Sequence, residues 1–142
     1  MSMKVSEAMS ESVLTVGPGH TLREAATLMA ARHIGSAVVH DPERQGPGII
    51  TERDIMLSLG AGESPDKELV ETHMAGDVIF AAPDWSLDDA AEAMISHGFR
   101  HLAVVSGGEL VGMLSMRDLV RCYVEIASAA AAVGPAAAAS ES

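Results

Sequence analysis

The feature that most constrains the fold of this chain is an internal repeat with an offset of 65 residues. Residues 12–41 align with residues 77–106 at this constant offset and without a gap. The identical positions, numbered in the first copy, are Val13, Pro18, Leu22, Ala25, Ala26, Met29 and Val39. A unit of this length contains several helices and strands, unlike the shorter units of most solenoids. Two copies therefore predict a pseudo-twofold protein with two equivalent clefts.

A second, more specific pattern follows in each copy. After one deletion the offset becomes 64, and residues 48–55, Gly-Ile-Ile-Thr-Glu-Arg-Asp-Ile, align with residues 112–119, Gly-Met-Leu-Ser-Met-Arg-Asp-Leu. A glycine, a hydroxyl residue, an arginine and an aspartate recur, while the residue after the hydroxyl varies. Function is therefore expected at positions that are present in both halves.

The composition limits the classes of partner. The chain has 142 residues, a formal net charge of −11 and 3% aromatic residues. Proteins that bind the nucleic-acid backbone need a basic stripe, so a nucleic-acid partner is not expected. The single cysteine, Cys122, cannot form an intrachain disulfide, which favours a reducing, cytoplasmic location. No apolar run reaches the length of a membrane span, so no membrane partner is expected.

Hydrophobic periodicity and turn residues predict the same order of elements in both halves, strand–helix–strand–strand–helix. Strands are expected at 13–15, 36–40, 48–50, 78–81, 102–105 and 110–114, and helices at 22–33, from 51, at 87–97 and from 115. A right-handed crossover should make the first two strands of each half parallel, and a hairpin should make the third antiparallel. Gly46-Pro47 should keep the strand that follows it short or at an edge, because proline cannot donate to a sheet ladder.

The predicted fold class is α/β with mixed sheets, built as two pseudo-twofold-related β-α-β-β-α repeats packed into one module. One three-stranded sheet with helices on one face buries too little apolar surface alone, so the halves should form one inseparable unit. The expected divisions are a first repeat at 1–60, a linker at 61–67, a second repeat at 68–127 and an alanine-rich tail at 128–142.

The recurring motif, Thr51-Glu52-Arg53-Asp54 and Ser115-Met116-Arg117-Asp118, has two interpretations. Ser/Thr-x-x-Asp is a capping box, which is structural. The motif also lies where the carboxyl end of a strand meets a helix start, a usual place for ligands in α/β units. An aspartate there can accept hydrogen bonds from both hydroxyls of a ribose. The hydroxyl residue, the free N–H groups of the helix start and the arginine suit a phosphate.

Five segments spread over residues 3–126 form a specific combination, and they are residues 5–9, 33–39, 48–54, 100–105 and 110–118. Together they resemble the tandem cystathionine-β-synthase-type (CBS) domain pair of stand-alone proteins. The resemblance implies a regulatory module that binds AMP, ADP, ATP or S-adenosylmethionine in clefts between two repeats, as an energy or metabolite sensor. No cofactor is required for this role. The expected partners are a second copy, in a homodimer, and an unknown regulated protein.

The resemblance also implies which residues hold the ligand. Asp54 and Asp118 would hold ribose, and Thr51 and Ser115 would contact ribose or phosphate. The other implied ligand-binding residues are Arg53, Arg100, His101 and Arg117 for phosphate, and Val13, Leu14, Thr15, Val78, Ile79 and Phe80 around adenine. The alternatives are a solvated helix face for Arg53 and Arg117, and a histidine packed at the sheet edge for His101.

The two halves differ in charge, since Arg100-His101 stands where the first half has Gly35-Ser36, and we therefore expect asymmetric occupancy. The sequence contains no nucleophile–base pair and no cofactor loop, and its six histidines form no recognised metal-ligand spacing. We accordingly expect neither an enzyme nor a metal site. The alternative function is a protein-interaction module with vestigial clefts that contacts its partner through its helices.

Overall fold

The computed structural model describes residues 3–43, 47–75 and 79–133, and it contains two three-stranded sheets, each covered by helices. The chain divides into two compact units. The first-repeat unit is formed by residues 11–80, and the second-repeat unit by residues 1–10 and 81–142. The mixed α/β class expected from the sequence is confirmed. None of the helices in the described ranges combines the length and the apolar character needed to span a membrane.

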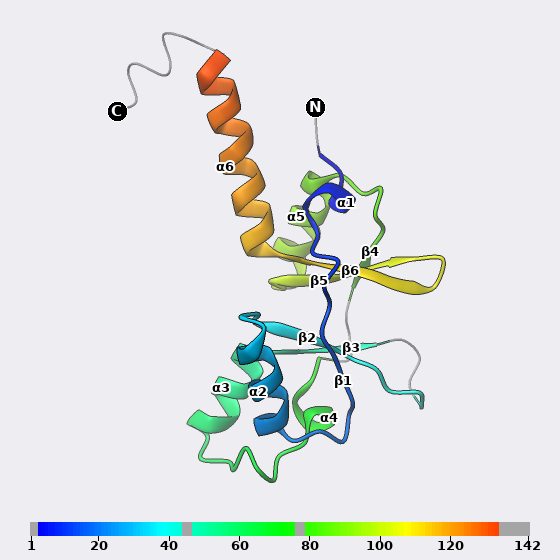
Figure 1. The fold of residues 1–142 in the computed structure, drawn as a ribbon, viewed down its shortest axis with the longest axis vertical. Helices are drawn as coiled ribbons and strands as arrows, with labels where there is room; N and C mark the ends of the chain where they lie inside the picture. Colours follow the sequence, from blue (N-terminus) through cyan, green and yellow to red (C-terminus); the bar gives the residue numbers. More distant parts are fainter. Residues whose placement is uncertain (1–2, 44–46, 76–78, 134–142) are drawn as a thin grey trace. The chain divides into compact units, whose positions relative to one another are not determined.

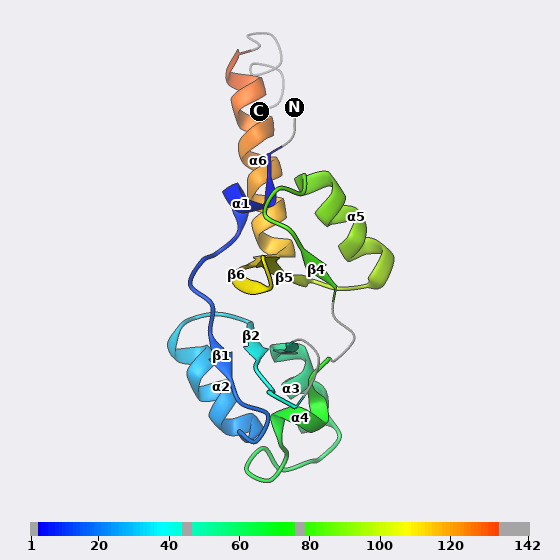
Figure 2. The same cartoon turned by 90° about the vertical axis from the view of Figure 1, so that its right-hand side faces the viewer.

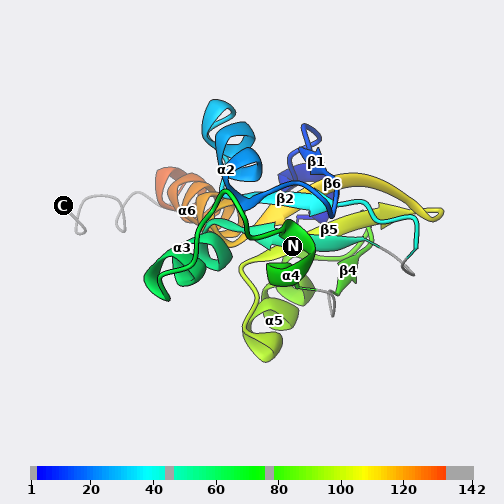
Figure 3. The ribbon, with the colours of Figure 1, turned by 90° about the horizontal axis from the view of Figure 1, so that it is seen from below.

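The first-repeat unit contains a sheet in the order β1-β2-β3. Its elements are β1 (Thr15–Val16), α2 (Leu22–Ala31), β2 (Ser36–Val39), β3 (Gly48–Thr51), α3 (Glu52–Gly60) and α4 (Val70–His73). β1 runs parallel to β2, and β3 runs antiparallel to β2, as predicted. The helices of this unit cover one face of its sheet, and α2 and α3 lie side by side (Figures 1 and 3).

The second-repeat unit contains a sheet in the order β4-β5-β6. Its elements are α1 (Val5–Ala8), β4 (Phe80–Ala81), α5 (Leu87–His97), β5 (His101–Ser106), β6 (Glu109–Ser115) and α6 (Met116–Val133). β5 and β6 form the predicted antiparallel hairpin, across Gly107 and Gly108 with φ of 59° and 81°. Figure 2 shows α6 extending well past the sheet of its own unit.

Several predicted boundaries differ from those of the structure, among them the strand expected at 78–81, which comprises Phe80–Ala81. The first strand comprises Thr15–Val16 rather than 13–15, because only these residues pair with β2. The helix expected to reach His33 ends at Ala31, since His33 adopts a φ of 54° that turns the chain out of the helix. Gly46, Val78 and the tail beyond residue 133 lie outside the described residues. β3 is four residues long and lies at the edge of its sheet, as the proline next to it predicted.

The core of the first-repeat unit is aliphatic and lies between α2, α3 and the sheet. Leu22, Val39, Ile50 and Val70 are fully buried in it. In α2, Ala25 is fully buried and Ala26 packs against the same core, so the helix lies close to the strands. At about 25 cal/mol per Å² of apolar surface, burial of such aliphatic side chains is the main favourable contribution to folding.

Each of the short helices α1 and α4 packs in the compact unit that contains the sheet of the other sequence repeat. α1 precedes the first repeat but belongs to the second-repeat unit, where Val5 N–H donates to the Trp85 carbonyl at 2.8 Å. In the first-repeat unit, Val70 N–H of α4 donates to the His20 carbonyl at 2.8 Å. Both pairs are related by the 65-residue offset. Each unit therefore combines the sheet of one sequence repeat with the leading helix of the other.

Candidate ligand-binding site

The predicted site of the first repeat lies at one end of the β1-β2-β3 sheet. Thr51, at the carboxyl end of β3, is the register partner of Ser36, at the start of β2. Val38 N–H donates to the Leu14 carbonyl at 2.9 Å, so the segment before β1 reaches the same end of the sheet. The structure thus brings the predicted adenine and ribose segments of this repeat together, although they are about forty residues apart in sequence.

Asp54 forms a complete capping box with Thr51 at the start of α3. Its Oδ2 accepts from the Thr51 backbone N–H at 2.8 Å and from the Thr51 hydroxyl at 2.9 Å. The Asp54 N–H in turn donates to Thr51 Oγ1 at 3.3 Å. These bonds satisfy N–H groups that have no intrahelical acceptor. The structural interpretation of the motif is therefore confirmed.

The same geometry recurs at the start of α6. Asp118 Oδ2 accepts from the Ser115 N–H at 2.9 Å and from the Ser115 hydroxyl at 2.8 Å, and the Asp118 N–H donates to Ser115 Oγ at 3.1 Å. Both aspartates are half-buried. In each capping box a single oxygen, Oδ2, accepts both bonds, so the cap leaves the other oxygen of the carboxylate available for a further donor.

The second oxygens have different surroundings. Asp118 Oδ1 lies 3.4 Å from Nη2 of Arg121, one turn further along α6. The corresponding position, three residues after Asp54, is the uncharged Leu57. Because the Arg121 side chain is 57% exposed, this pair is screened by solvent and contributes little.

The charges around the two motifs differ further. In the second repeat, His101 is the register partner of Ser115, and the Arg100 carbonyl accepts from Met116 N–H at 2.7 Å. The structure therefore places the backbone of Arg100 and His101 beside that of Ser115 and Met116.

In the first repeat, Gly35 takes the place of Arg100, and its carbonyl accepts from Glu52 N–H at 2.9 Å. A Cβ built on Gly35 would lie 2.9 Å from the Glu52 carboxylate, so an acidic side chain covers this position. The sequence beside the second motif therefore carries Arg100 and His101, whereas the first motif has a glycine covered by a carboxylate.

The remaining predicted ligand-binding residues differ in their exposure to solvent. Arg53 and Arg117 are exposed on their helices, while Val13, Ile79 and Phe80 are half-buried. Leu14 is 6% exposed and packs in the core of the first-repeat unit, and its carbonyl accepts the bond from Val38 N–H, so its side chain is not available to a ligand. Thr15 is exposed, and Val78 lies outside the described residues.

A shallow groove of about 360 Å³ lies away from these motifs, between α2 and α3. It is lined by Ala26, Ala30, Ile55 and Leu59 among others, and by none of the predicted ligand-binding residues. The groove is almost wholly apolar and offers no cluster of polar groups to orient a nucleotide.

Comparison with known proteins agrees with this architecture. The CBS domain model matches residues 5–61 and 67–125. An uncharacterised 17.7 kDa protein of Acidianus ambivalens is 39% identical over 127 residues, which cover 89% of this chain and 76% of that protein. The chain spans less than two thirds of the length of two further curated relatives.

Two solved structures similar to this chain contain adenosine compounds. The CBS domain protein PAE2072 from Pyrobaculum aerophilum, complexed with AMP, has a TM-score of 0.73 and 30% identity, over 82% of this chain and 89% of that one. The CBS domain pair of protein MJ0100, in complex with 5'-methylthioadenosine and S-adenosyl-L-methionine, has a TM-score of 0.79 and 25% identity, over 88% and 98%. On the family match and the shared fold, this chain belongs to the CBS domain family, with two CBS domains in tandem.

Proposed function

We propose that this chain is a regulatory module that binds adenosine-containing ligands of the AMP, ADP, ATP or S-adenosylmethionine class, rather than an enzyme. The observation that supports it most is the pair of half-buried aspartates, Asp54 and Asp118, each holding a helix cap with one oxygen only. The second oxygen of each suits the hydroxyl groups of a ribose. Similar structures with AMP, and with 5'-methylthioadenosine and S-adenosylmethionine, support this class of ligand.

The two sites are proposed to differ in preference. Beside the shared arginine of the motif, Arg53 or Arg117, the second repeat adds Arg100, whose positive charge suits phosphate groups. Glu52 and Gly35 make the first motif a poorer phosphate site, so it should favour an adenosine compound without phosphate or stay empty. A ligand with one or more phosphates should therefore occupy the second site first.

The proposed readout is assembly with other proteins. A homodimer formed through the exposed helical faces, in a cytoplasmic setting, would change its geometry when ligand stabilises one of its states. An unknown partner protein would respond to that change. The alternative, an interaction module with vestigial clefts, is favoured by Met56, Leu57 and Leu59, which are 51–60% exposed on α3.

Ligand binding is tested by calorimetry and thermal melts of the full chain with AMP, ATP, 5'-methylthioadenosine and S-adenosylmethionine. Ligand that binds the native state should raise the melting temperature with its concentration. Asp118→Ala should weaken AMP affinity by roughly 30- to 150-fold, because a charged acceptor of two hydrogen bonds contributes about 2–3 kcal/mol.

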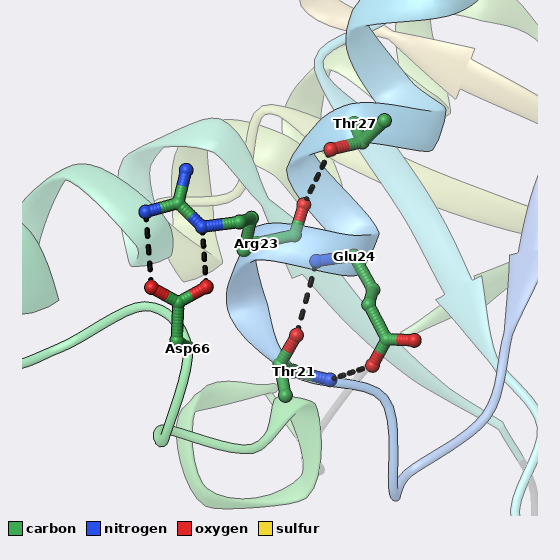
Figure 4. A network of polar contacts seen from close by, with 5 residues as sticks. All are labelled: Thr21, Arg23, Glu24, Thr27 and Asp66. Atoms are coloured by element: carbon green, nitrogen blue, oxygen red, sulfur yellow. Dashed lines mark hydrogen bonds and ion pairs between the residues drawn. The ribbon is translucent and has the colours of Figure 1, made fainter.

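Glu24→Ala is the matched control. Glu24 completes a capping box with Thr21 at the start of α2, with no predicted ligand role, as Figure 4 shows. Each of the three changes, at Glu24, Asp54 and Asp118, should cost about 1 kcal/mol of stability by loss of a cap. Only the aspartate changes should alter affinity. Binding that is unaffected by both Asp54→Ala and Asp118→Ala would contradict the proposed site.

A further inference from the structure

A cluster of three side chains outside the proposed ligand sites, Glu63, Glu68 and His73, brings its donor atoms within 4.8 Å of one another. His73 is the last residue of α4, while the two glutamates come from the segment that connects α3 to α4. Their spacing of five residues matches no metal-ligand motif, so nothing along the chain groups them. From this geometry we propose that Glu63, Glu68 and His73 bind one divalent transition-metal ion, of which Zn²⁺ is the best fit.

The distances suit such an ion. His73 Nε2 lies 2.7 Å from Glu68 Oε1 and 3.8 Å from Glu63 Oε1. Zinc bonds to nitrogen and carboxylate oxygen are about 2.1 Å long, which places tetrahedral ligand atoms about 3.4 Å apart. The two observed separations lie on either side of this value, and all three donor atoms lie within 4.8 Å of one another, so the side chains would have to adjust to centre an ion.

The donor set selects the class of metal. An imidazole with two carboxylates suits zinc and similar transition metals, whereas calcium and magnesium prefer oxygen ligands alone. Three protein ligands leave a fourth position for water. A metal bound to His73 Nε2 would replace the present hydrogen bond between this nitrogen and Glu68 Oε1.

The ligands are held in place by other contacts. Glu63 Oε1 accepts a hydrogen bond at 2.8 Å from the hydroxyl of Ser58, which is 3% exposed. The connecting segment is tied to α2 by Arg23, which pairs with both oxygens of Asp66 (Figure 4) and donates its backbone N–H to the Pro65 carbonyl at 3.0 Å. This order lowers the entropy that metal binding must overcome. Since the Glu63 side chain is 41% exposed, solvent gives an ion access to the cluster.

A bound ion would join the α3–α4 segment to α4. α4 carries the fully buried Val70, and just beyond it Ala75 pairs with Ile49 of β3 through N–H···O bonds of 2.9 and 3.1 Å. The ion would therefore stabilise the exchanged helix on the first-repeat unit, separately from any nucleotide bound at Asp54 or Asp118.

The test uses the full chain without a polyhistidine tag, titrated with Zn²⁺ against a chelating dye, and with Co²⁺ as a spectroscopic probe. One equivalent of Zn²⁺ should bind, excess Mg²⁺ should not displace it, and Co²⁺ should give the visible absorption of low-coordinate cobalt. Glu68→Gln and His73→Gln should each weaken Zn²⁺ binding at least about tenfold, since even outer-shell partners of metal ligands typically contribute 10- to 100-fold.

Glu71→Gln, on the same short helix but outside the cluster, and His40→Gln are the matched controls and should bind as the unaltered chain does. Glu63→Gln, at the most exposed ligand, keeps the test valid if His73→Gln does not fold. Lack of stoichiometric Zn²⁺ binding by the unaltered chain would overturn the proposal and leave a simple histidine–glutamate pair. Binding that all three ligand substitutions leave unchanged would also overturn it.

Discussion

At the scale of single residues, an aspartate that caps a helix through one carboxylate oxygen can offer its other oxygen to a ligand. Asp54 and Asp118 use one oxygen for the cap, and that oxygen accepts both bonds from the preceding hydroxyl residue. The difference between the two sites then lies in their neighbours. Asp118 has Arg121 beside its second oxygen, so a ribose bound at the proposed second site would have to displace a weak, solvent-screened pair.

A carboxylate of α5, Asp88, perturbs the tyrosine of α6, Tyr123. The hydroxyl of Tyr123 donates a hydrogen bond to Asp88, and this bond, followed by burial and the negative charge, raises the pKa of Tyr123 from 10.0 to about 12. A raised folded-state pKa stabilises the protein below the unfolded pKa, and the contribution is lost as pH rises from about 10 through about 12.

Because Tyr123 is the only tyrosine, absorbance of its phenolate reports this titration directly. The folded protein should show a midpoint of about 12, and Asp88→Asn should move it down toward 10.0. Asp89→Asn, at the neighbouring exposed position, should leave it unchanged. A midpoint near 10.0 in the unaltered folded protein would mean that the hydrogen bond to Asp88 does not form.

At the scale of elements, the edge strands β3 and β6 depend on glycines where another segment approaches closely. A Cβ on Gly112 would lie 2.5 Å from Sδ of Met9 and 3.0 Å from the Ser10 carbonyl oxygen. On Gly48 it would lie 2.9 Å from Sδ of Met74 and 3.1 Å from the Ala75 carbonyl oxygen. Met9 and Met74 are related by the repeat offset, so both units solve the same packing problem in the same way.

Gly112→Ala and Gly48→Ala should each lower the free energy of unfolding by about 1–3 kcal/mol, because backbone must move to admit the methyl group. Denaturant unfolding measures this change, and the tighter site, Gly112, should show the larger effect. Gly19→Ala is the control, since nothing lies within 4 Å of its Cβ position. Its effect should stay within about 0.5 kcal/mol. Equal stability of all three variants would show that the segments around Met9 and Met74 can move away from β6 and β3 without loss of stability.

At the scale of the whole molecule, the compact units are not the sequence repeats. Val5 and Val70 are both fully buried, each in the unit whose sheet belongs to the other repeat. Ser10 and Met113 exchange two N–H···O bonds of 2.9 Å, which joins the N-terminal segment to β6. Neither sequence repeat can therefore complete its own unit, and the two repeats depend on each other for stability.

This exchange predicts crossed effects of two matched substitutions. Val5→Ala should raise amide hydrogen exchange in residues 81–133, and Val70→Ala should raise it in residues 11–60. Each removes side-chain atoms from a fully buried valine, whose burial contributes about 1.5–3 kcal/mol. Val120→Ala, at a side chain that is 55% exposed, is the control. Faster exchange confined to the sequence repeat that contains the substitution would contradict the exchanged arrangement.

The sequence by itself determined the features that depend on neighbours along the chain. The capping boxes, the helix that ends at Gly98 with its φ of 68°, the antiparallel hairpins and the strand–helix–strand–strand–helix order of each repeat were predicted, whereas the short helices α1 and α4 were not. Caps, turns and periodicity act over a few residues, so their signals can be read directly. The resemblance to a known family added the candidate ligand-binding residues, and comparison with known proteins confirmed the family.

Only the tertiary structure decided which distant segments meet. It assigned α1 and α4 to the opposite units, turned the side chain of Leu14 into the core, and placed Glu52 over Gly35. It also brought Glu63 and Glu68 to His73. The two copies of the repeat present nearly the same local signals, so those signals cannot choose between partners. That choice depends on which pairing buries more apolar surface and satisfies more backbone hydrogen bonds, and these quantities exist only in the folded chain.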